Sequence, residues 1–331
     1  MVTHSRIDLT RFPLLGSLSP GTTQQHEVAL PGSELAGETW PVTTVTGSEP
    51  GPVVFINAGI HGGEYPAIET VIRLGKYLNP TDLVGAVVLM PVVNFPAFWQ
   101  RSMFVCPVDN LNPNRAFPGD PHGSYTEQLV YALTNEFIAH ADLHIDLHGG
   151  DMVEDLVPFS ICQQGESAAN KTALELAMVF GLPNVLLVDR PVQASKGTLS
   201  YAAAAARGIP SFIAEAGGVG QLQQDAVDLL QAGVLRVLHH LGMLKTAMPE
   251  CAQPTLLRSF EWLYCQNAGM FYPSVATNDE VEVGQIVGTI GSLFGETLEE
   301  IMSPVAGRVL FLTSSPAVVK AGLLMGIGVA S

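Results

Sequence analysis

The sequence predicts an α/β fold built on a mixed, mostly parallel sheet with helices on both faces, followed by a small C-terminal all-β domain. Between residues 53 and 245, short apolar runs alternate with longer segments of helical character. Strands interleaved with helices are typical of parallel or mixed sheets that carry helices on both faces. After residue 254 the pattern changes to short strand-like runs separated by glycines, which indicates the second, all-β domain.

The predicted elements of the α/β part follow one another in order. Strands are expected at Val53–Asn57, Val87–Asn94, Leu143–His148, Asn184–Val188 and Ser211–Glu215. Helices are expected at Tyr65–Leu78, Thr126–Ala139, Ala168–Phe180, Ser200–Arg207 and Gln221–Leu241. Pro66 fits the start of a helix, because a first-turn proline loses no intrahelical hydrogen bond. Residues 248–254 have the composition of a linker, so we predict a catalytic α/β domain over residues 1–248 and a β domain over residues 255–331.

A repeated sequence frame marks the small domain. The segments 281–288 and 319–326 both follow the pattern Val-x-x-Gly-x-x-x-Gly. This repeat resembles the barrel-sandwich fold of biotinyl and lipoyl domains, which carry their cofactor on a lysine in the central hairpin. The corresponding segment 295–302 contains no lysine. The domain is therefore expected to carry no attached cofactor and to act as a lid or an assembly surface.

Composition and charge argue against several classes of protein. With 47% hydrophobic and 14% charged residues, the chain has enough apolar side chains for a substantial core, and disorder is not expected. A formal net charge of −16 argues against nucleic acid and anionic membrane surfaces as partners, because both require clustered Lys and Arg. No uninterrupted apolar stretch is long enough to span a bilayer, and no apolar signal segment follows the N-terminus. The four cysteines lack Cys-x-x-Cys spacing, so neither a disulfide framework nor a cysteine zinc site is expected. We expect a cytoplasmic protein with a small-molecule partner, and leave homo-oligomerisation open.

Two histidines and a carboxylate stand where predicted strands end. His61 and Glu64 are three residues apart, between the apolar run Val53–Ile56 and a helix-like segment, and His148 ends the run Leu143–Leu147. In open α/β sheets the reactive groups gather outside the carboxyl ends of the strands. Two imidazoles and one carboxylate are the ligands of a catalytic zinc that keeps its fourth position open for water. The sequence therefore predicts one Zn²⁺ per chain at these three residues, with cobalt or manganese as substitutes.

Glu215 ends a third apolar run and precedes the glycine-rich segment 216–220. A carboxylate at the end of a buried strand needs a partner, because burying an unpaired charge is costly. A salt-bridged or helix-capping glutamate is one explanation. Next to the three predicted ligands, a general base that takes a proton from the attacking water is the other.

Together these motifs resemble the zinc carboxypeptidase superfamily, and most of all its succinylglutamate desuccinylase/aspartoacylase branch. The matching residues are His61-x-x-Glu64, Asp146-Leu147-His148, Glu215 and the segment 110–119, Asn-Leu-Asn-Pro-Asn-Arg-Ala-Phe-Pro-Gly, which is similar to the branch's Asn-Arg-x-Phe-Pro-Gly signature. The resemblance runs from about Val53 to Gly220. It implies a zinc carboxypeptidase-like fold and hydrolysis of the amide bond of a small N-acyl amino acid. For the tyrosine that many relatives bring over the site, the sequence offers Tyr264 and Tyr272 as candidates.

The resemblance also implies how the substrate is held. Asn114 and Arg115 would bind the substrate's carboxylate, since arginine pairs with carboxylates through a rigid two-donor fork. Arg101 would stabilise the developing oxyanion, with a surface ion pair as the alternative. Asp109 would orient one of these arginines.

Acidic residues near His148 leave two interpretations open. Asp146 lies two residues earlier, on the same face of the strand, and either orients this ligand or makes a buried structural hydrogen bond. The segment 151–155, Asp-Met-Val-Glu-Asp, holds three acids. It is either a solvated acidic turn or a rim that favours a substrate with a cationic side group, such as an N-acylated diamino acid.

The sequence as a whole predicts a zinc-dependent deacylase of desuccinylase, aspartoacylase or N-acetyl-diamino acid deacetylase type. A metallocarboxypeptidase acting on short peptides is the alternative with the same chemistry. A non-catalytic metal-binding scaffold is the alternative outside it. A scaffold needs no base at Glu215, which favours an enzyme.

Overall fold

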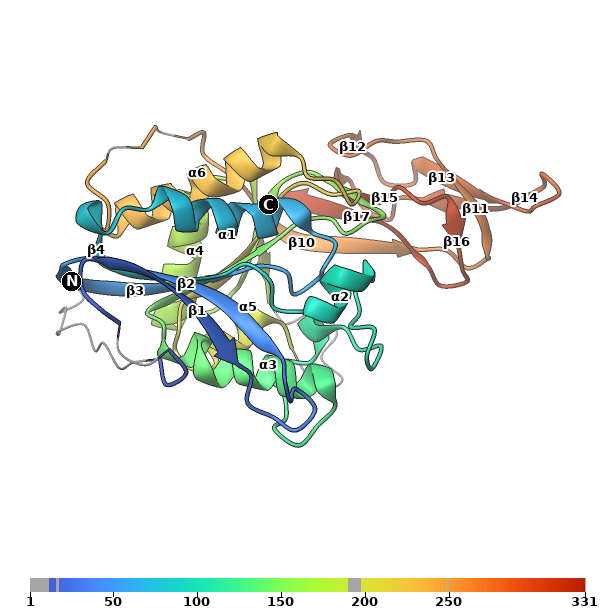
Figure 1. Cartoon of the computed structure of the whole chain (residues 1–331). Helices are drawn as coiled ribbons and strands as arrows, with labels where there is room; N and C mark the ends of the chain where they lie inside the picture. The colour runs from blue at the N-terminus through green and yellow to red at the C-terminus, as the bar shows by residue number, and fades with distance from the viewer. Residues whose placement is uncertain (1–11, 16–17, 190–197, 247, 250, 331) are drawn as a thin grey trace.

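The computed structural model describes residues 12–15, 18–189, 198–246, 248–249 and 251–330, and Figure 1 shows an α/β body with a β extension towards the C-terminus. The helices are α1 (Tyr65–Tyr77), α2 (Phe95–Gln100), α3 (Tyr125–Glu136), α4 (Ala168–Phe180), α5 (Ser200–Ala205) and α6 (Gln224–His240), with short 3-10 helices η1 (Pro80–Asp82), η2 (Pro113–Arg115) and η3 (Ile138–His140). The strands of the body are β1 (Thr22–Ala29), β2 (Thr39–Thr46), β3 (Glu49–Asn57), β4 (Val84–Met90), β5 (Leu143–His148), β6 (Glu154–Leu156), β7 (Phe159–Gln163), β8 (Asn184–Val188) and β9 (Ser211–Glu215). The C-terminal strands are β10 (Thr255–Tyr264), β11 (Gly269–Pro273), β12 (Glu280–Val281), β13 (Ile286–Gly291), β14 (Thr297–Met302), β15 (Gly307–Thr313), β16 (Ala317–Val318) and β17 (Leu323–Ala330).

Thirteen strands form one mixed sheet with the order β1-β2-β4-β3-β5-β9-β7-β8-β10-β17-β15-β12, and β6 pairs with β15. Strands β4, β3, β5 and β9 run parallel to one another, as do β7, β8 and β10. The two groups meet where β9 pairs antiparallel with β7. The predicted mixed sheet of the body, with its largely parallel centre, is confirmed.

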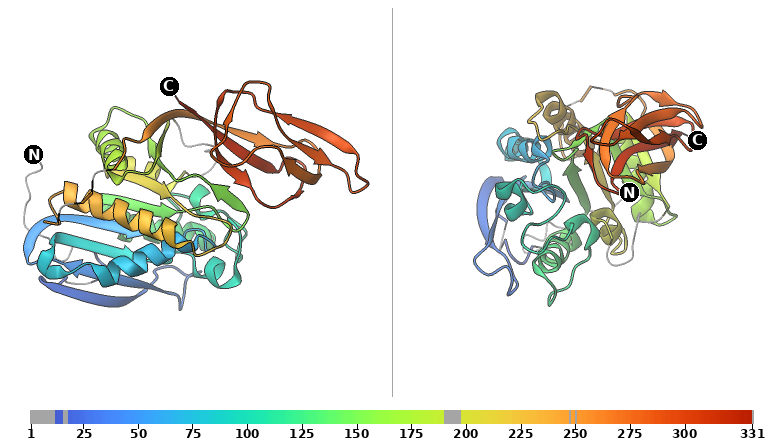
Figure 2. Two further views of the ribbon diagram at one scale, coloured as in Figure 1. Left: turned by 90° about the horizontal axis from the view of Figure 1, so that it is seen from above. Right: turned by 90° about the vertical axis from the view of Figure 1, so that its right-hand side faces the viewer.

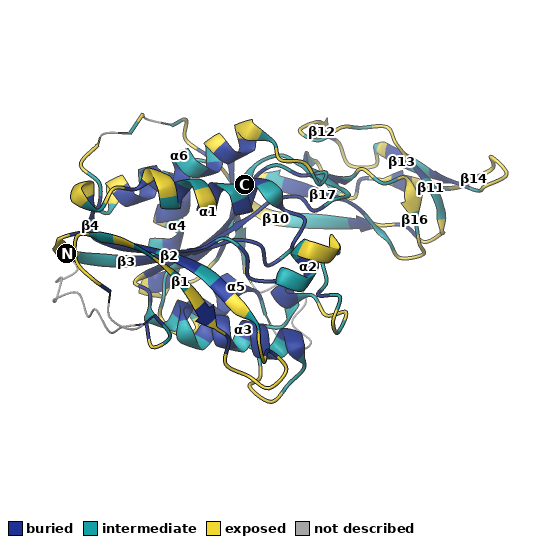
Figure 3. Ribbon diagram, viewed as in Figure 1, coloured by how far each residue is buried: buried dark blue, intermediate teal, exposed yellow. Residues whose placement is uncertain are grey.

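Helices cover both faces of this sheet, as Figures 1 and 2 show. Alternate residues of β3 enter two different cores: Val54 and Ile56 pack with residues of α1, α4 and α6, whereas Val53 and Phe55 pack with residues of α3 and α5. Successive side chains of a strand point to opposite faces, so a strand buried on both faces appears in the sequence as a continuous apolar run. Figure 3 shows the central strands buried between the helical layers.

The predicted elements of the body agree with the structure most closely where the apolar pattern is strongest. Strands β5, β8 and β9 and helix α4 have the predicted bounds. The expected strand Val87–Asn94 is too long, because β4 ends at Met90 and the side chain of Asn94 accepts a hydrogen bond from Ala97 N (3.3 Å) to cap α2. The antiparallel pair β1 and β2, joined to β4, was not expected. Polar residues occupy much of β1, so it lacks an apolar run.

The C-terminal region is all-β, as predicted. Strand β10 joins the main sheet by pairing parallel with β8, and β17 and β15 follow it. A second sheet with the order β14-β13-β11-β16 encloses a separate core with these strands, in which Phe271, Val287 and Ile290 contact Val309 and Ile327. Figure 2 shows this part projecting from the body. Because the main sheet continues from the body into this region, the division at residues 248 and 255 stays a prediction.

Two further expectations concern the whole chain. All four cysteines are free. Among the helices of the described residues, none combines the length and the apolar character needed to cross a membrane.

Candidate metal and active site

The two predicted ligands His61 and Glu64 lie in the tight connection between β3 and α1. Glu64 is the N-cap residue of α1, yet its side chain makes no capping hydrogen bond, because the carboxylate points to the imidazoles. The connection packs closely against its surroundings: a Cβ on Gly62 would lie 2.2 Å from the backbone N of Phe98, and one on Gly63 would lie 2.2 Å from the Asp151 carboxylate. Glycine is therefore needed at both positions for the turn that presents His61 and Glu64.

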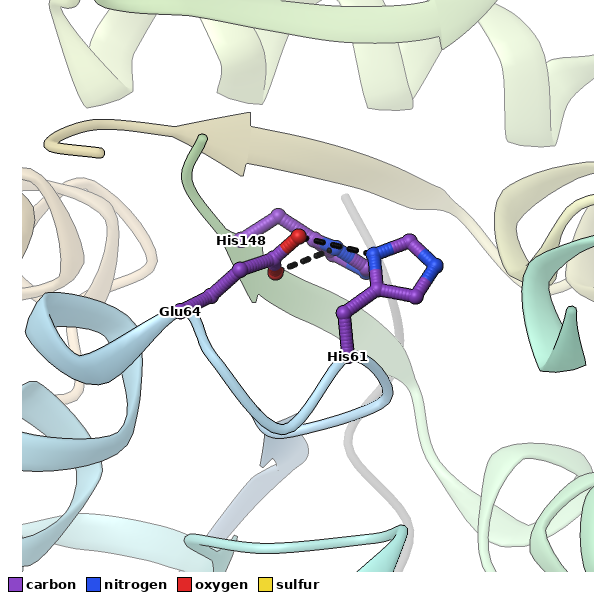
Figure 4. Close-up of side chains that lie close together, drawn as sticks. All are labelled: His61, Glu64 and His148. Carbon is purple, nitrogen blue, oxygen red and sulfur yellow. Dashed lines mark hydrogen bonds and ion pairs between the residues drawn. The ribbon is translucent and has the colours of Figure 1, made fainter. Parts of the chain in front are cut away.

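The third predicted ligand, His148, ends the neighbouring parallel strand β5 and meets the other two. His61 Nδ1 lies 2.7 Å from Glu64 Oε1, and His148 Nδ1 lies 2.8 Å from Glu64 Oε2. Figure 4 shows the Glu64 carboxylate pointing to both rings, with a dashed line from each oxygen to one of them. One ligand atom from each residue lies within 4.8 Å of the others. Both imidazoles therefore turn the same ring nitrogen, Nδ1, towards a common point.

This donor set fits a divalent cation. Glu64 and His148 are buried, and the two Glu64 oxygens lie within 2.8 Å of an imidazole nitrogen each. A buried carboxylate is costly unless a positive charge compensates it, and a metal ion bound between the three side chains would supply that charge. Mixed nitrogen and oxygen ligands suit zinc, so the residues present fit the metal that the sequence predicts.

The charges around the imidazoles favour a bound cation as well. Burial lowers the pKa of His148, but Asp146 and Glu64 outweigh this effect and raise its pKa well above the usual value. Burial likewise lowers the pKa of His61, and Glu64 raises it overall. The neighbouring carboxylates thus favour protons on both rings. Because a metal ion takes the place of such protons, metal binding is expected to release them.

Asp146 supports His148 from behind. Its Oδ2 atom lies 3.2 Å from His148 Nε2 and accepts a hydrogen bond from Ser200 Oγ, while Oδ1 accepts one from Asn57 Nδ2 at 2.7 Å. A carboxylate on the remote nitrogen of a ligating histidine fixes the orientation of the ring and makes it more basic. Asp146 is thus held by buried hydrogen bonds at ion-pair distance from His148, and its role in orienting a metal ligand stays a prediction.

The buried network continues to His144, which lies two residues before Asp146 on β5. His144 Nε2 lies 2.6 Å from Asn57 Oδ1, and Nδ1 lies 2.8 Å from Ser211 Oγ. Burial lowers the pKa of His144 to about 4, so the ring is neutral at neutral pH. Since the Asn57 oxygen only accepts, Nε2 carries the proton and donates it, and Nδ1 accepts from Ser211. This chain holds the Asn57 amide in the orientation that donates to Asp146.

Glu215 lies beside the triad of His61, Glu64 and His148, because it ends β9 in register with His148 of β5. Burial raises the pKa of Glu215 well above its usual value; His148 opposes the shift, whereas Glu64 and Glu154 add to it. A general base is most effective when its pKa is near the working pH. The environment of Glu215 shifts its pKa in that direction.

A cavity of about 430 Å³ opens beside His61 and Glu64. His61, Glu64 and Glu215 form one end of its lining. Much of the remaining wall is apolar and comes from β7, β8 and the C-terminal strands β10, β15 and β17; its residues include Ile161, Leu186, Val188, Phe260, Trp262 and Phe311. The C-terminal strands therefore contribute directly to the walls of the site.

The structure brings Asn114 and Arg115 to this cavity. Both lie in η2, where the Asn114 side-chain oxygen accepts a hydrogen bond from Ser200 N (3.2 Å) and Arg115 Nη1 donates one to Asn114 O (2.7 Å). Burial lowers the pKa of Arg115, and the guanidinium forms none of the ion pairs found among the described residues. Its remaining donors are available to an anionic ligand.

Two other predicted residues lie differently. Among the described residues, Asp109 forms no ion pair with an arginine: its carboxylate accepts hydrogen bonds from Thr126 N (2.8 Å), Thr126 Oγ1 (2.7 Å) and Leu111 N (3.2 Å). It ties the loop to the start of α3, which corrects the interpretation from the sequence. Arg101 is exposed at the C-cap of α2 with φ of 54° and is absent from the described lining of the cavity. The role of Arg101 in stabilising an oxyanion stays a prediction that this arrangement does not support.

Some residues of the site have no counterpart in the sequence analysis. Asn112 Oδ1 lies 3.1 Å from His61 Nε2 and holds that ring as Asp146 holds His148. Tyr201, at the start of α5, lines the cavity, whereas the candidates Tyr264 and Tyr272 are about half exposed and are absent from its described lining. Asn112 lies inside the recognised segment 110–119, where the sequence assigned it no role, and this position was the one available signal.

Comparison with known proteins agrees with the family that the sequence motifs resemble. The family model of the succinylglutamate desuccinylase/aspartoacylase catalytic domain matches residues 50–241. The Nα-acetyl-L-2,4-diaminobutyric acid deacetylase of Halomonas elongata is 29% identical over 255 residues, which are 76% of this chain and 73% of the relative.

Solved structures of other proteins match the fold of this chain over almost its whole length. A succinylglutamate desuccinylase/aspartoacylase from Rhodobacter sphaeroides matches with a TM-score of 0.82 and 26% identity, covering 93% of this chain and 95% of the other. The product-bound ectoine utilization protein EutE (DoeB) from Ruegeria pomeroyi matches with a TM-score of 0.84 and 23% identity, covering 94% and 97%. Because the family model alone spans more than half of the sequence, the chain belongs to the succinylglutamate desuccinylase/aspartoacylase family.

Proposed function

We propose that this amidohydrolase is a zinc-dependent deacylase that removes a small acyl group from the α-amine of an amino acid. That it is an amidohydrolase acting on N-acyl amino acids follows from its family. The observation that carries the finer proposal is the convergence of His61 Nδ1, His148 Nδ1 and the Glu64 carboxylate beside Glu215. The named relative that acts on Nα-acetyl-L-2,4-diaminobutyrate makes an Nα-acetylated diamino acid our first candidate substrate.

In this proposal His61, Glu64 and His148 hold the metal, and Asn112 and Asp146 keep the two rings in place. When bound, zinc polarises the amide carbonyl and lowers the pKa of the attacking water. Asn114 and Arg115 bind the carboxylate of the substrate. This contact fixes the scissile amide relative to Glu215, and such positioning lowers the barrier of a reaction between bound groups.

Glu215 moves the proton. Its carboxylate takes a proton from water as the water oxygen attacks the amide carbon. The same proton then passes to the departing nitrogen as the C–N bond breaks, so the products are a carboxylic acid and a free amine. The apolar walls of the cavity exclude bulk water, which strengthens the electrostatic contacts around the reacting atoms.

Metal removal and substrate choice test the proposal together. We expect protein treated with a chelator to lose turnover of N-acetyl and N-succinyl amino acids, and one equivalent of Zn²⁺ to restore it. Products are measured by chromatography on a panel that includes short peptides with a free C-terminus. Turnover that survives complete metal removal would contradict zinc dependence, and cleavage of the peptides alone would favour a carboxypeptidase.

Replacing Arg115 by alanine is expected to weaken carboxylate recognition. A hydrogen bond to a charged group contributes about 1.5–3 kcal/mol, so kcat/KM for N-acyl amino acids should fall by roughly 10- to 100-fold, mainly through KM. The corresponding amino acid amides, which lack the carboxylate, should be much less affected. The matched control is Arg258→Ala, because Arg258 is an exposed arginine of β10. Equal losses on both substrate types would indicate that Arg115 supports the fold instead.

A further inference from the structure

One carboxylate of the cavity has no assigned partner. Glu154 begins β6, which pairs with β15 through Glu154 and Thr313, and both residues line the cavity. Its Oε2 atom accepts a hydrogen bond from Asp151 N at 3.0 Å. The other oxygen, Oε1, takes part in none of the hydrogen bonds or ion pairs of the described residues. A carboxylate that lines a largely apolar cavity and has one oxygen without a hydrogen bond is suited to bind a cation.

The neighbouring acids of the same segment are already engaged. Asp151 is buried, and its oxygens accept hydrogen bonds from Met152 N and Phe104 N at 2.7 Å each. Asp155 Oδ2 accepts a hydrogen bond from Thr277 Oγ1 at 2.8 Å. Neither residue lines the cavity in its described part. Of the three acids in segment 151–155, Glu154 is therefore the one that faces the cavity.

The surroundings of Glu154 disfavour the ionised form of its carboxyl group. Burial raises the pKa of Glu154 to about 7; the hydrogen bond from Asp151 opposes the shift and Glu64 adds to it. A cation held against the carboxylate would stabilise the ionised form, because opposite charges nearby favour ionisation. His61 and Arg115 both interact electrostatically with Glu154, but neither is among the ion pairs that the described residues form with this carboxylate within 4.0 Å.

We infer that Glu154 binds a second, cationic amine on the side chain of the substrate and so selects Nα-acyl diamino acids. The inference rests on the proposed deacylase function and extends it to a specificity-determining residue. With its carboxylate at Arg115, the substrate places its aliphatic side chain along the apolar wall, as the stems of long cationic side chains do in proteins. Its ammonium group then donates hydrogen bonds to Glu154. An uncharged or acidic side chain would leave the Glu154 carboxylate unpaired.

The test is the variant Glu154→Gln, which removes the charge and keeps an oxygen that accepts from Asp151 N. Two substrates differ only in the ammonium group: Nα-acetyl-2,4-diaminobutyrate and N-acetyl-2-aminobutyrate. We expect kcat/KM for the diamino substrate to fall by roughly 10- to 100-fold, the usual effect of losing a charge-assisted hydrogen bond. The value for N-acetyl-2-aminobutyrate should change less than about threefold. Calorimetry with 2,4-diaminobutyrate, the free amine product, should record a matching loss of affinity.

The matched control is Asp155→Asn, a charge removal on the same strand outside the cavity, which should leave both kcat/KM values unchanged. Equal losses on the two substrates in Glu154→Gln, or a wild type that cleaves the monoamino substrate as well as the diamino one, would overturn the inference and leave the deacylase function intact. A wild type that cleaves neither substrate, nor any other N-acyl amino acid, would overturn the proposed function itself. The two failures are thus distinguishable.

Discussion

Replacing Glu215 by glutamine is expected to lower kcat by roughly 10²- to 10⁴-fold, the usual contribution of general acid–base catalysis, while the metal content stays the same. The carboxylate of Glu215 ends β9 in register with His148 and lines the cavity. Glutamine has almost the same shape and cannot take a proton from water. Glutamine is neutral, so this substitution removes one negative charge from the group of buried acids around Glu64. It adds no charge repulsion, and we expect the fold to keep its stability.

The measurements are steady-state turnover, zinc content and thermal unfolding on the same preparation. Glu296→Gln is the matched control, since Glu296 is an exposed glutamate in the turn between β13 and β14. A Glu215→Gln protein with near-normal kcat would show that Glu215 has a structural role. A protein that loses zinc together with turnover would indicate that Glu215 acts on the metal and not on the proton.

The second large effect is expected for His148→Ala, which should lose zinc and turnover together. His148 Nδ1 is 2.8 Å from Glu64 Oε2, and alanine supplies no ligand atom in its place. Two remaining ligands bind zinc much more weakly than three. Turnover should therefore fall to the background of the assay at stoichiometric zinc.

Thermal stability gives an independent measure of the same loss. A ligand that binds only the folded state at 100 times its Kd stabilises that state by about 2.7 kcal/mol, so zinc should raise the Tm of the wild type and of the control His122→Ala. His122 is an exposed histidine outside the cavity lining. The Tm of His148→Ala should not respond to zinc. Full zinc retention in this variant and in His61→Ala would refute the ligand assignment.

The grouping of His61, Glu64, His148 and Glu215 could be predicted because His148 and Glu215 end apolar runs, and His61 and Glu64 lie in the connection that follows a third run. The order of neighbouring parallel strands then brings the ends of β3, β5 and β9 together. Apolar strands buried on both faces give the strongest local signal, and the bounds of β5 and β9 were predicted without error. The polar strand β1 has no such signal.

Residues that depend on the register of strands or on loop geometry could not be predicted in the same way. Asn57 donates a hydrogen bond to Asp146 because the two residues are paired across β3 and β5. The register between two strands cannot be predicted from the sequence of either strand alone. Asp109 was misassigned because loop acids serve nearby backbone N–H groups as readily as distant arginines. The cavity wall from β10, β15 and β17 depends on the C-terminal strands joining the main sheet, which no local pattern predicts. A cytoplasmic location and homo-oligomerisation both stay predictions.

The central claim is that the two Nδ1 atoms and the Glu64 carboxylate hold one zinc ion, and a crystal structure of the zinc-loaded protein with anomalous data at the zinc edge tests it most directly. We predict a single strong anomalous peak per chain, at bonding distance from His61 Nδ1, His148 Nδ1 and Glu64, with Asp146 still beside His148 Nε2. A protein that binds zinc elsewhere, or that has no peak between these three side chains, would contradict the account.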